Sequence, residues 1–291
     1  MKNLAPKWQS LIEWLLPWLV LSILVIFTYA KFVAVPYLGF GFLNGKITEV
    51  FIPTPDHSIQ AGDQVIQVDQ LQVSAFLENM HLAIFKGVKS GDEISLILDR
   101  GGEITNVKWK IPGPNQIQLL QRLNGIWWLP YIFWAAGTAT LLFTRPKDTR
   151  WKLLIAFNFL TAIWLSAGAG PSQWHVWKSA VIMRMVVWLC LPVYIHFHWE
   201  FPIKLRHLSR TFWRILYASG ITLAILEWFQ ILPRTTAFSG FAAILILSIF
   251  LIIAHAIFQQ EYRRDIAVLG LAVGICLLPV IGSALASFSS G

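Results

Sequence analysis

Seven apolar runs follow one another along this 291-residue chain, and a longer stretch of mixed polarity separates the first run from the other six. This stretch covers residues 37–112, and several of its short segments alternate apolar with polar positions. A helix needs about 20 apolar residues to cross a bilayer. We therefore predict a multi-pass α-helical membrane protein with about seven transmembrane helices, near residues 15–30, 126–143, 153–169, 179–196, 212–232, 241–258 and 266–286.

The first apolar run has two interpretations. Lys2 and Lys7 precede it, and Thr28-Tyr29-Ala30 ends in a small residue, as a weakly matching signal-peptide cleavage site would. Its length is close to that of a membrane span, which favours a retained anchor helix.

Lysine and arginine residues concentrate in every second connection between the apolar runs. These connections hold Arg145, Lys147, Arg150 and Lys152; then Lys204, Arg206, Arg210 and Arg214; and then Arg263 and Arg264. Short loops rich in lysine and arginine stay in the cytoplasm. We therefore expect a protein of the bacterial cell (inner) membrane whose amino terminus is in the cytoplasm. Residues 37–112 and the carboxyl terminus would then lie outside the cytoplasm.

Composition agrees with a membrane protein whose main partner is the lipid bilayer. Hydrophobic residues make up 56% of the chain and charged residues only 13%, with a mean hydropathy of +0.60. The net charge of +8 comes from short loops beside apolar runs, so we expect no nucleic-acid partner. Cys190 and Cys276 lie inside apolar runs without a CxxC partner, which argues against a disulfide or zinc site.

The stretch at residues 37–112 has the pattern of a small α+β domain. Short β-prone segments occur at residues 47–52, 64–68, 94–98 and 107–111. Residues 74–85 have helical apolar spacing, with Ser74 as the expected amino-terminal cap. Gly101-Gly102 predicts a tight turn between the last two strands.

Two motifs in this stretch resemble those of PDZ domains. Gly39-Phe40-Gly41-Phe42 resembles the family's Gly-Φ-Gly-Φ carboxylate-binding loop, in which Φ is apolar. Residues 61–69, Ala-Gly-Asp-Gln-Val-Ile-Gln-Val-Asp, resemble a shortened form of the family's Ala-Gly-x-x-Gly-Asp-x-Ile-x-x-Val-Asn/Asp signature. The resemblance implies a PDZ-like domain at residues 37–112, between an amino-terminal helix and linker at residues 1–36 and a six-helix region at residues 113–291.

The resemblance also implies a ligand. Backbone N–H groups of Phe40, Gly41 and Phe42 would hold the carboxylate of a peptide or protein C-terminus, which adds a strand to the sheet edge. Gly39 and Gly41 suit a sharp turn that a ligand approaches closely. Phe42 and the helix at residues 74–85 would line the groove for the ligand's side chains. A simpler interpretation stays open, in which the glycine-aromatic turn only starts a strand.

Arg184 and Glu227 are ionisable residues inside predicted membrane helices, where a charge is costly and commonly functional. Both are expected in the outer half of the bilayer, so they can pair. We favour a pair that holds two helices together, while Lys178 extends towards the interface. The alternative is a substrate pathway in a transporter.

We find no catalytic constellation in the sequence. No H-E-x-x-H string occurs, and the alternate spacing of His196, His198 and Glu200 turns successive members by about 200° around a helix. A serine protease would pair Ser166 with a histidine of another helix, but the predicted depths do not coincide. No phosphate-binding loop is present either. We therefore expect no enzymatic activity, cofactor or metal in this chain.

The membrane region resembles that of some bacterial sensor histidine kinases and related signalling proteins. The resemblance rests on Thr144-Arg145-Pro146-Lys147-Asp148, on residues 191–202 (Leu-Pro-Val-Tyr-Ile-His-Phe-His-Trp-Glu-Phe-Pro) and on Tyr262-Arg263-Arg264-Asp265. It implies a sensor whose output domain is cytoplasmic. With a carboxyl end expected outside, either an eighth helix and an output domain follow, or the protein signals through a partner.

Three hypotheses follow from the sequence. The leading one is a non-enzymatic sensor or receptor module whose outer domain binds a peptide or protein C-terminus. The second is an accessory subunit that presents bound clients to a membrane protease or transporter. The third is a transporter centred on Arg184 and Glu227.

Gly270 and Gly274 have the GxxxG spacing of close helix contacts, which allows a homodimer as well as packing within one chain.

Overall fold

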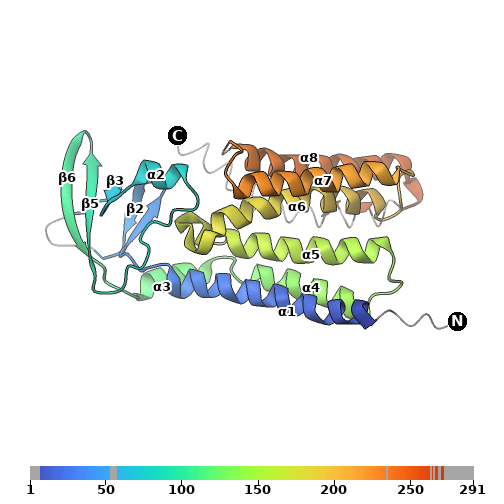
Figure 1. Cartoon of the computed structure of the whole chain (residues 1–291), viewed down its shortest axis with the longest axis horizontal. Helices are drawn as coiled ribbons and strands as arrows, with labels where there is room; N and C mark the ends of the chain where they lie inside the picture. The colour runs from blue at the N-terminus through green and yellow to red at the C-terminus, as the bar shows by residue number, and fades with distance from the viewer. Residues whose placement is uncertain are drawn as a thin grey trace.

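The computed structural model describes residues 7–52, 58–233, 235–262, 264, 266–267 and 270–271. It is mostly helical, with one antiparallel sheet at the end of a long helical bundle (Figure 1). The bundle helices that run along the long axis are α1 (Lys7–Tyr29), α4 (Leu129–Phe143), α5 (Thr149–Gly168), α6 (Ser179–Glu200), α7 (Arg210–Trp228) and α8 (Thr235–Phe258). The π-helical turn η1 (Ala30–Ala34) continues α1, and α3 (Gln116–Asn124) precedes α4.

Five stretches of the described residues are long and apolar enough to cross a membrane. They are Glu13–Ala34, Gln116–Phe143, Thr149–Gly168, Val176–Glu200 and Thr235–Phe258. The prediction of about seven spans is therefore confirmed only in part. The predicted span at residues 212–232 forms a helix, α7, which ends at Trp228 and includes Arg214 and Glu227, and it is not among the five. The seventh predicted span, at residues 266–286, lies almost entirely outside the described residues.

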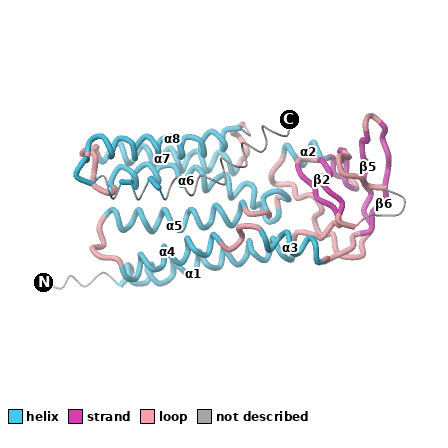
Figure 2. Tube along the Cα trace, turned by 180° about the vertical axis from the view of Figure 1, so that it is seen from behind, coloured by secondary structure: helices cyan, strands magenta, loops and turns pink. Residues whose placement is uncertain are grey.

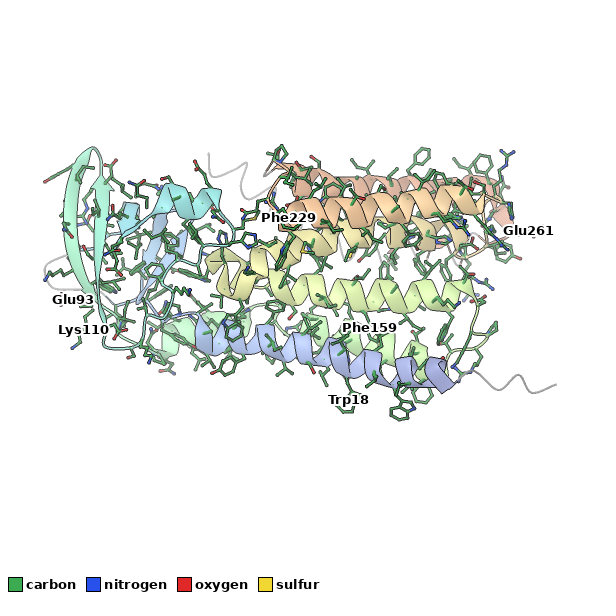
Figure 3. All side chains as sticks on the ribbon, viewed as in Figure 1. Trp18, Glu93, Lys110, Phe159, Phe229 and Glu261 are labelled. Atoms are coloured by element: carbon green, nitrogen blue, oxygen red, sulfur yellow. The ribbon has the colours of Figure 1, made fainter. Side chains whose placement is uncertain are left out.

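Apolar packing joins the bundle helices. Val20 and Leu24 of α1 pack with Trp151 and Phe159 of α5 in one buried cluster. Large apolar side chains also cover the outside of the bundle, and Trp18 and Phe229 are 62% and 66% exposed (Figure 3). Water-soluble proteins rarely expose apolar surface on this scale, whereas lipid solvates it well. The bundle is therefore compatible with a membrane protein.

The position of the sheet relative to the lysine- and arginine-rich connections bears on the membrane topology. The sheet lies at one end, and the α4–α5 and α6–α7 connections lie at the other (Figures 1 and 2). Glu93 and Lys110 mark the sheet end in Figure 3, and Glu261 marks the opposite end. The lysine- and arginine-rich connections are thus far from the sheet.

The sheet has the order β1-β2-β3-β5-β6, with β4 paired to β3. Its strands are β1 (Phe40–Leu43), β2 (Lys46–Val50), β3 (Gln64–Val68), β4 (Leu71–Gln72), β5 (Glu93–Arg100) and β6 (Glu103–Lys110). One buried apolar cluster from the strands and the short helix α2 (Val73–Glu78) forms its core. Gly101 and Gly102 form the two-residue turn between β5 and β6, both with positive φ, as predicted. Strand β1 begins at the glycine-aromatic turn, where sequence analysis left open the start of a strand, whereas β4 was not predicted.

The predicted helix at residues 74–85 is wrong in two respects. Helix α2 ends at Glu78, and Gln72 rather than Ser74 is its amino-terminal cap residue. Asn79 is extended, and its Oδ1 accepts hydrogen bonds from His81 N and from Gln230 Nε2 of the bundle. These bonds give the backbone an alternative to another helical turn. Met80 and Ile84, whose spacing indicated a helix, are buried nonetheless.

An ion pair ties the β2–β3 connection to β5. The carboxylate of Asp63 is 2% exposed and accepts hydrogen bonds from Arg100 Nε at 2.8 Å, Arg100 Nη2 at 2.7 Å and Gln60 N at 2.8 Å. Burial by itself would raise the pKa of Asp63, but the hydrogen bonds from Arg100 and Gln60 outweigh it and hold that pKa below its ordinary value. The pair fixes the end of the domain that carries the shortened signature motif.

Candidate functional site

The motif Gly39-Phe40-Gly41-Phe42 begins the edge strand β1. The side chains of Phe40 and Phe42 are buried in the sheet core. Gly39 has φ +79°, and a Cβ there would lie 2.9 Å from the Pro112 ring, while a Cβ on Gly41 would collide with the hydroxyl group of Thr48. Tight packing therefore requires both glycines.

Alternate backbone groups of β1 point towards and away from β2. The carbonyl of Gly39 accepts hydrogen bonds from Phe51 N at 2.8 Å and Ile52 N at 3.1 Å, just beyond β2. The carbonyls of Phe40 and Phe42 are bonded on the opposite side, to groups outside the sheet domain. They form the edge to which an added strand would bind.

Two glutamine side chains of the bundle bind this edge. Gln118, at the start of α3, accepts a hydrogen bond from Gly39 N at 3.1 Å and donates to Phe40 O at 3.5 Å. Gln173, in the connection between α5 and α6, donates through Nε2 to Phe42 O. The polar groups of the edge are thus bonded to side chains from outside the sheet.

Aromatic side chains from the same connection cover the space between β1 and α2. The connection contains the 3₁₀ turns η2 (Pro171–Trp174) and η3 (Val176–Lys178). The Trp174 ring stacks on Phe42, with centroids 5.6 Å apart, and lies 5.6 Å from the Phe85 ring. The His175 ring lies 4.3 Å from the Phe76 ring of α2, and its Nδ1 donates to the carbonyl of Leu82 at 2.9 Å.

A cavity of about 520 Å³ lies beside the β1 edge, at the junction with the bundle. Gly41 and Gln173 line it, together with two cationic residues, Lys31 of η1 and Arg122 of α3. Neither cation is in an ion pair among the described residues. Glu49 is the carboxylate in the lining, and it accepts a hydrogen bond from Gln121 at 3.0 Å.

Arg122 is held rigidly at this junction. Its guanidinium donates to the carbonyls of Lys31, Val35 and Pro36 at 2.8, 3.0 and 2.9 Å, and it lies 3.7 Å from the centre of the Tyr37 ring. Backbone carbonyls orient the guanidinium but do not neutralise it. The cavity therefore has a fixed positive charge near the β1 edge, which favours an anionic group.

The sheet domain also contacts Arg184, which forms a buried pair with Glu227. Arg184 Nε of α6 lies 3.6 Å from Glu227 Oε2 of α7, and both side chains are buried. Trp188 Nε1 donates to Glu227 Oε1 at 3.3 Å. Arg184 Nη1 also lies 2.9 Å from Met80 Sδ of the sheet domain. The structure thus brings together the two residues that sequence analysis singled out, with a third partner that it did not identify.

A second set of bonds joins the sheet domain to the end of α7. Gln230 Oε1 accepts from Met80 N at 2.9 Å, and His81 Nε2 donates to the carbonyl of Trp228 at 2.8 Å. Together with the bond from Gln230 to Asn79, they fix residues 79–81 against the bundle. Displacement of this segment would therefore act directly on α6 and α7.

The histidines near the far end of α6 take separate structural roles. His196 stacks on Trp213 at 3.7 Å between ring centroids, whereas the carbonyl of His198 accepts a hydrogen bond from His255 of α8. The part of the chain that the structure describes contains no group of three or more His, Cys, Asp or Glu residues that could hold a metal ion.

Sequence analysis identified the β1 motif but missed Gln118, Gln173 and Trp174. Residues 171–178, Pro-Ser-Gln-Trp-His-Val-Trp-Lys, contain two tryptophans and a histidine, an unusual composition for a short connection between two apolar runs. That composition was the sequence signal that could have indicated this site.

When the chain was compared with protein-family models, with curated proteins and with solved structures, none of the three comparisons gave a match.

Proposed function

We propose that this protein is a non-enzymatic membrane sensor or receptor module whose PDZ-like outer domain binds a peptide or protein C-terminus. The observation that carries the proposal is the β1 edge. Its Phe40 and Phe42 carbonyls point away from β2, beside a cavity lined by Lys31 and Arg122. An extended peptide adds to such an edge through backbone hydrogen bonds, and its terminal carboxylate lies near the two cations.

The proposed topology places the sheet domain outside the cytoplasm of a bacterial cell membrane. Its support is the distance between the sheet and the lysine- and arginine-rich connections, which lie at opposite ends of the bundle (Figure 1). Cysteine substitutions at Lys110 and Arg206, in a chain whose Cys190 and Cys276 are replaced by alanine, test this placement. A membrane-impermeant maleimide applied to intact cells should label the first site and not the second. Labelling of the second site alone would reverse the topology.

Peptide binding is testable with the full chain in lipid nanodiscs. The probes are decapeptides that end in Val, Leu, Phe or Ala, each made with a free and an amidated C-terminus. We expect the free acids to bind more tightly. Lys31→Gln should weaken their binding about tenfold, about 1.4 kcal/mol, since one charge-assisted contact is lost.

The matched control is Lys108→Gln on β6, at the opposite edge of the sheet from β1. Its ammonium is exposed and outside the cavity lining, so binding should not change. Equal affinity for free and amidated peptides, or equal effects of the two substitutions, would contradict carboxylate recognition at this cavity. Absence of binding by all of the peptides would contradict the function itself.

A further inference from the structure

We propose that the α5–α6 connection is an internal occupant of the strand-addition site, and that an external peptide must displace Gln173 and Trp174 to bind. The proposal rests on the function given above and concerns the regulation of the same site. Its basis is that residues 173–175 already supply three contacts, one hydrogen bond and two apolar contacts, of the kinds that an added peptide strand makes.

The first contact is the hydrogen bond to the strand edge. An added strand donates its N–H groups to outward-facing carbonyls of the edge strand. Gln173 Nε2 makes such a bond to the Phe42 carbonyl with its side-chain amide. A peptide N–H cannot take the same position until that amide leaves.

The second and third contacts are apolar. Trp174 fills the space against Phe42 and Phe85, and His175 covers Phe76 of α2. A peptide that binds between β1 and α2 places its own side chains in this space. Occupation by the connection and occupation by a peptide therefore exclude each other.

The connection adopts a strained backbone in this position. His175, Trp177 and Lys178 have φ values of 53°, 48° and 61°, in the left-handed region that side chains with a Cβ rarely adopt. Strained residues persist only where surrounding contacts hold them, and they concentrate at switch segments. Release of the connection from β1 therefore relieves strain, which offsets part of the cost of displacing Trp174.

Displacement would be transmitted into the bundle. Helix α6 begins at Ser179, immediately after the connection, and Arg184 lies on its second turn between Met80 of the sheet domain and Glu227 of α7. Movement of the connection therefore acts on the same side chains that join the domain to α6 and α7. Peptide binding and helix arrangement become coupled through one short segment.

The open cavity gives the incoming peptide a first binding position. Gly41, Gln173 and Trp174 line it in the positions that the structure shows. The terminal carboxylate can bind beside Lys31 and Arg122 first, and the residues before it then compete with the connection for the β1 edge.

The test compares Gln173→Ala/Trp174→Ala with Trp177→Ala in the full chain in nanodiscs. Trp177 belongs to the same connection, but its ring stacks on Tyr29 of α1, with centroids 5.9 Å apart, and is 49% exposed. Amide hydrogen exchange of residues 40–43 should become at least about tenfold faster in the double variant and stay unchanged in Trp177→Ala. Affinity for the free-acid decapeptides should rise about tenfold in the double variant only.

Failure of this proposal is distinct from failure of the proposed function. Unchanged exchange of residues 40–43 in the double variant would overturn occupation by the connection, whatever the peptides do. Equal peptide affinity of wild type and double variant would overturn displacement while peptide binding stands. Faster exchange without binding of any decapeptide would uphold occupation and refute the function. Gln173→Ala alone, which keeps the tryptophan, provides the exchange test if the double variant does not fold.

Discussion

The buried pair of Arg184 and Glu227 gives the sharpest prediction about the bundle. The two side chains lie 3.6 Å apart, a separation at which opposite charges attract by about 5 kcal/mol at an effective dielectric constant of about 20. Desolvation of both groups, at several kcal/mol per ion, offsets most of this attraction. The pair therefore contributes little net stability, but removal of one partner leaves the other charge buried.

We expect Arg184→Met and Glu227→Leu each to lower the free energy of unfolding by about 3–5 kcal/mol. The double variant should lie within about 2 kcal/mol of wild type, because two apolar side chains then replace the ion pair. The control is Lys178→Met just before α6, which removes an exposed cation whose Nζ lies 5.0 Å from the centre of the Trp228 ring. Its effect should stay below about 1 kcal/mol.

Unfolding of the full chain in mixed micelles with rising SDS, followed by tryptophan fluorescence, measures these changes. Strictly additive single and double effects would refute the ion-pair explanation, since a double-mutant cycle isolates the interaction between the two residues. Single substitutions that leave stability unchanged but abolish substrate uptake into vesicles would instead support the transporter hypothesis.

Three further predictions concern the sheet domain and the helix contacts. Asp63→Asn should destabilise the sheet domain by about 2 kcal/mol at pH 7. Because the folded-state pKa of Asp63 is lowered, the stabilisation by its carboxylate is complete above pH about 4 and is lost as the pH falls through that pKa. Thermal unfolding of wild type and variant at pH 7 and pH 3 measures this loss. Gly240→Ala should cost about 1–3 kcal/mol in the SDS assay, since a Cβ there would lie 2.9 Å from the ring of Trp188. In thermal unfolding, Gly39→Ala should destabilise the domain by at least about 1 kcal/mol more than Gly87→Ala. Both glycines have φ +79°, but only Gly39 has packed neighbours at its Cβ position. Equal losses would show that packing against Pro112 does not add to the cost of the substitution.

Local patterns predicted the elements whose contacts are local. Strand β3 has the bounds expected from the β-prone segment at residues 64–68, and the β5–β6 hairpin forms at Gly101-Gly102 as its turn chemistry requires. The helix at residues 74–85 was wrong because Asn79 and the residues after it bond elsewhere: Asn79 accepts a local bond from His81 N, and Asn79 and Met80 also bond to Gln230. Gln230 lies about 150 residues away in the sequence. No local pattern contains that information.

In the candidate site, too, features with a local sequence pattern were predicted and features that depend on distant contacts were not. Gly39-Phe40-Gly41-Phe42 was singled out because it resembles the Gly-Φ-Gly-Φ loop of PDZ domains, in which glycines allow a tight backbone approach. The pairing of Arg184 with Glu227 followed from their expected depths in the bilayer, whereas the third contact, with Met80, depends on how the sheet docks on the bundle. The glutamines that bind the β1 edge belong to helices and connections whose position relative to the sheet has no sequence pattern.

The connection between α5 and α6 solves a problem that the exposed β1 edge creates. An edge strand at the junction of two packed parts leaves carbonyls that need hydrogen-bond donors, and an unfilled edge is costly. Gln118 and Gln173 supply those donors, and Trp174 supplies the apolar contact. In the proposed displacement the site is therefore never empty, because a bound peptide replaces the connection. The affinity for an external peptide is then a difference between two bound states, and it is set as much by the strained backbone at residues 175–178 as by the contacts of the peptide itself.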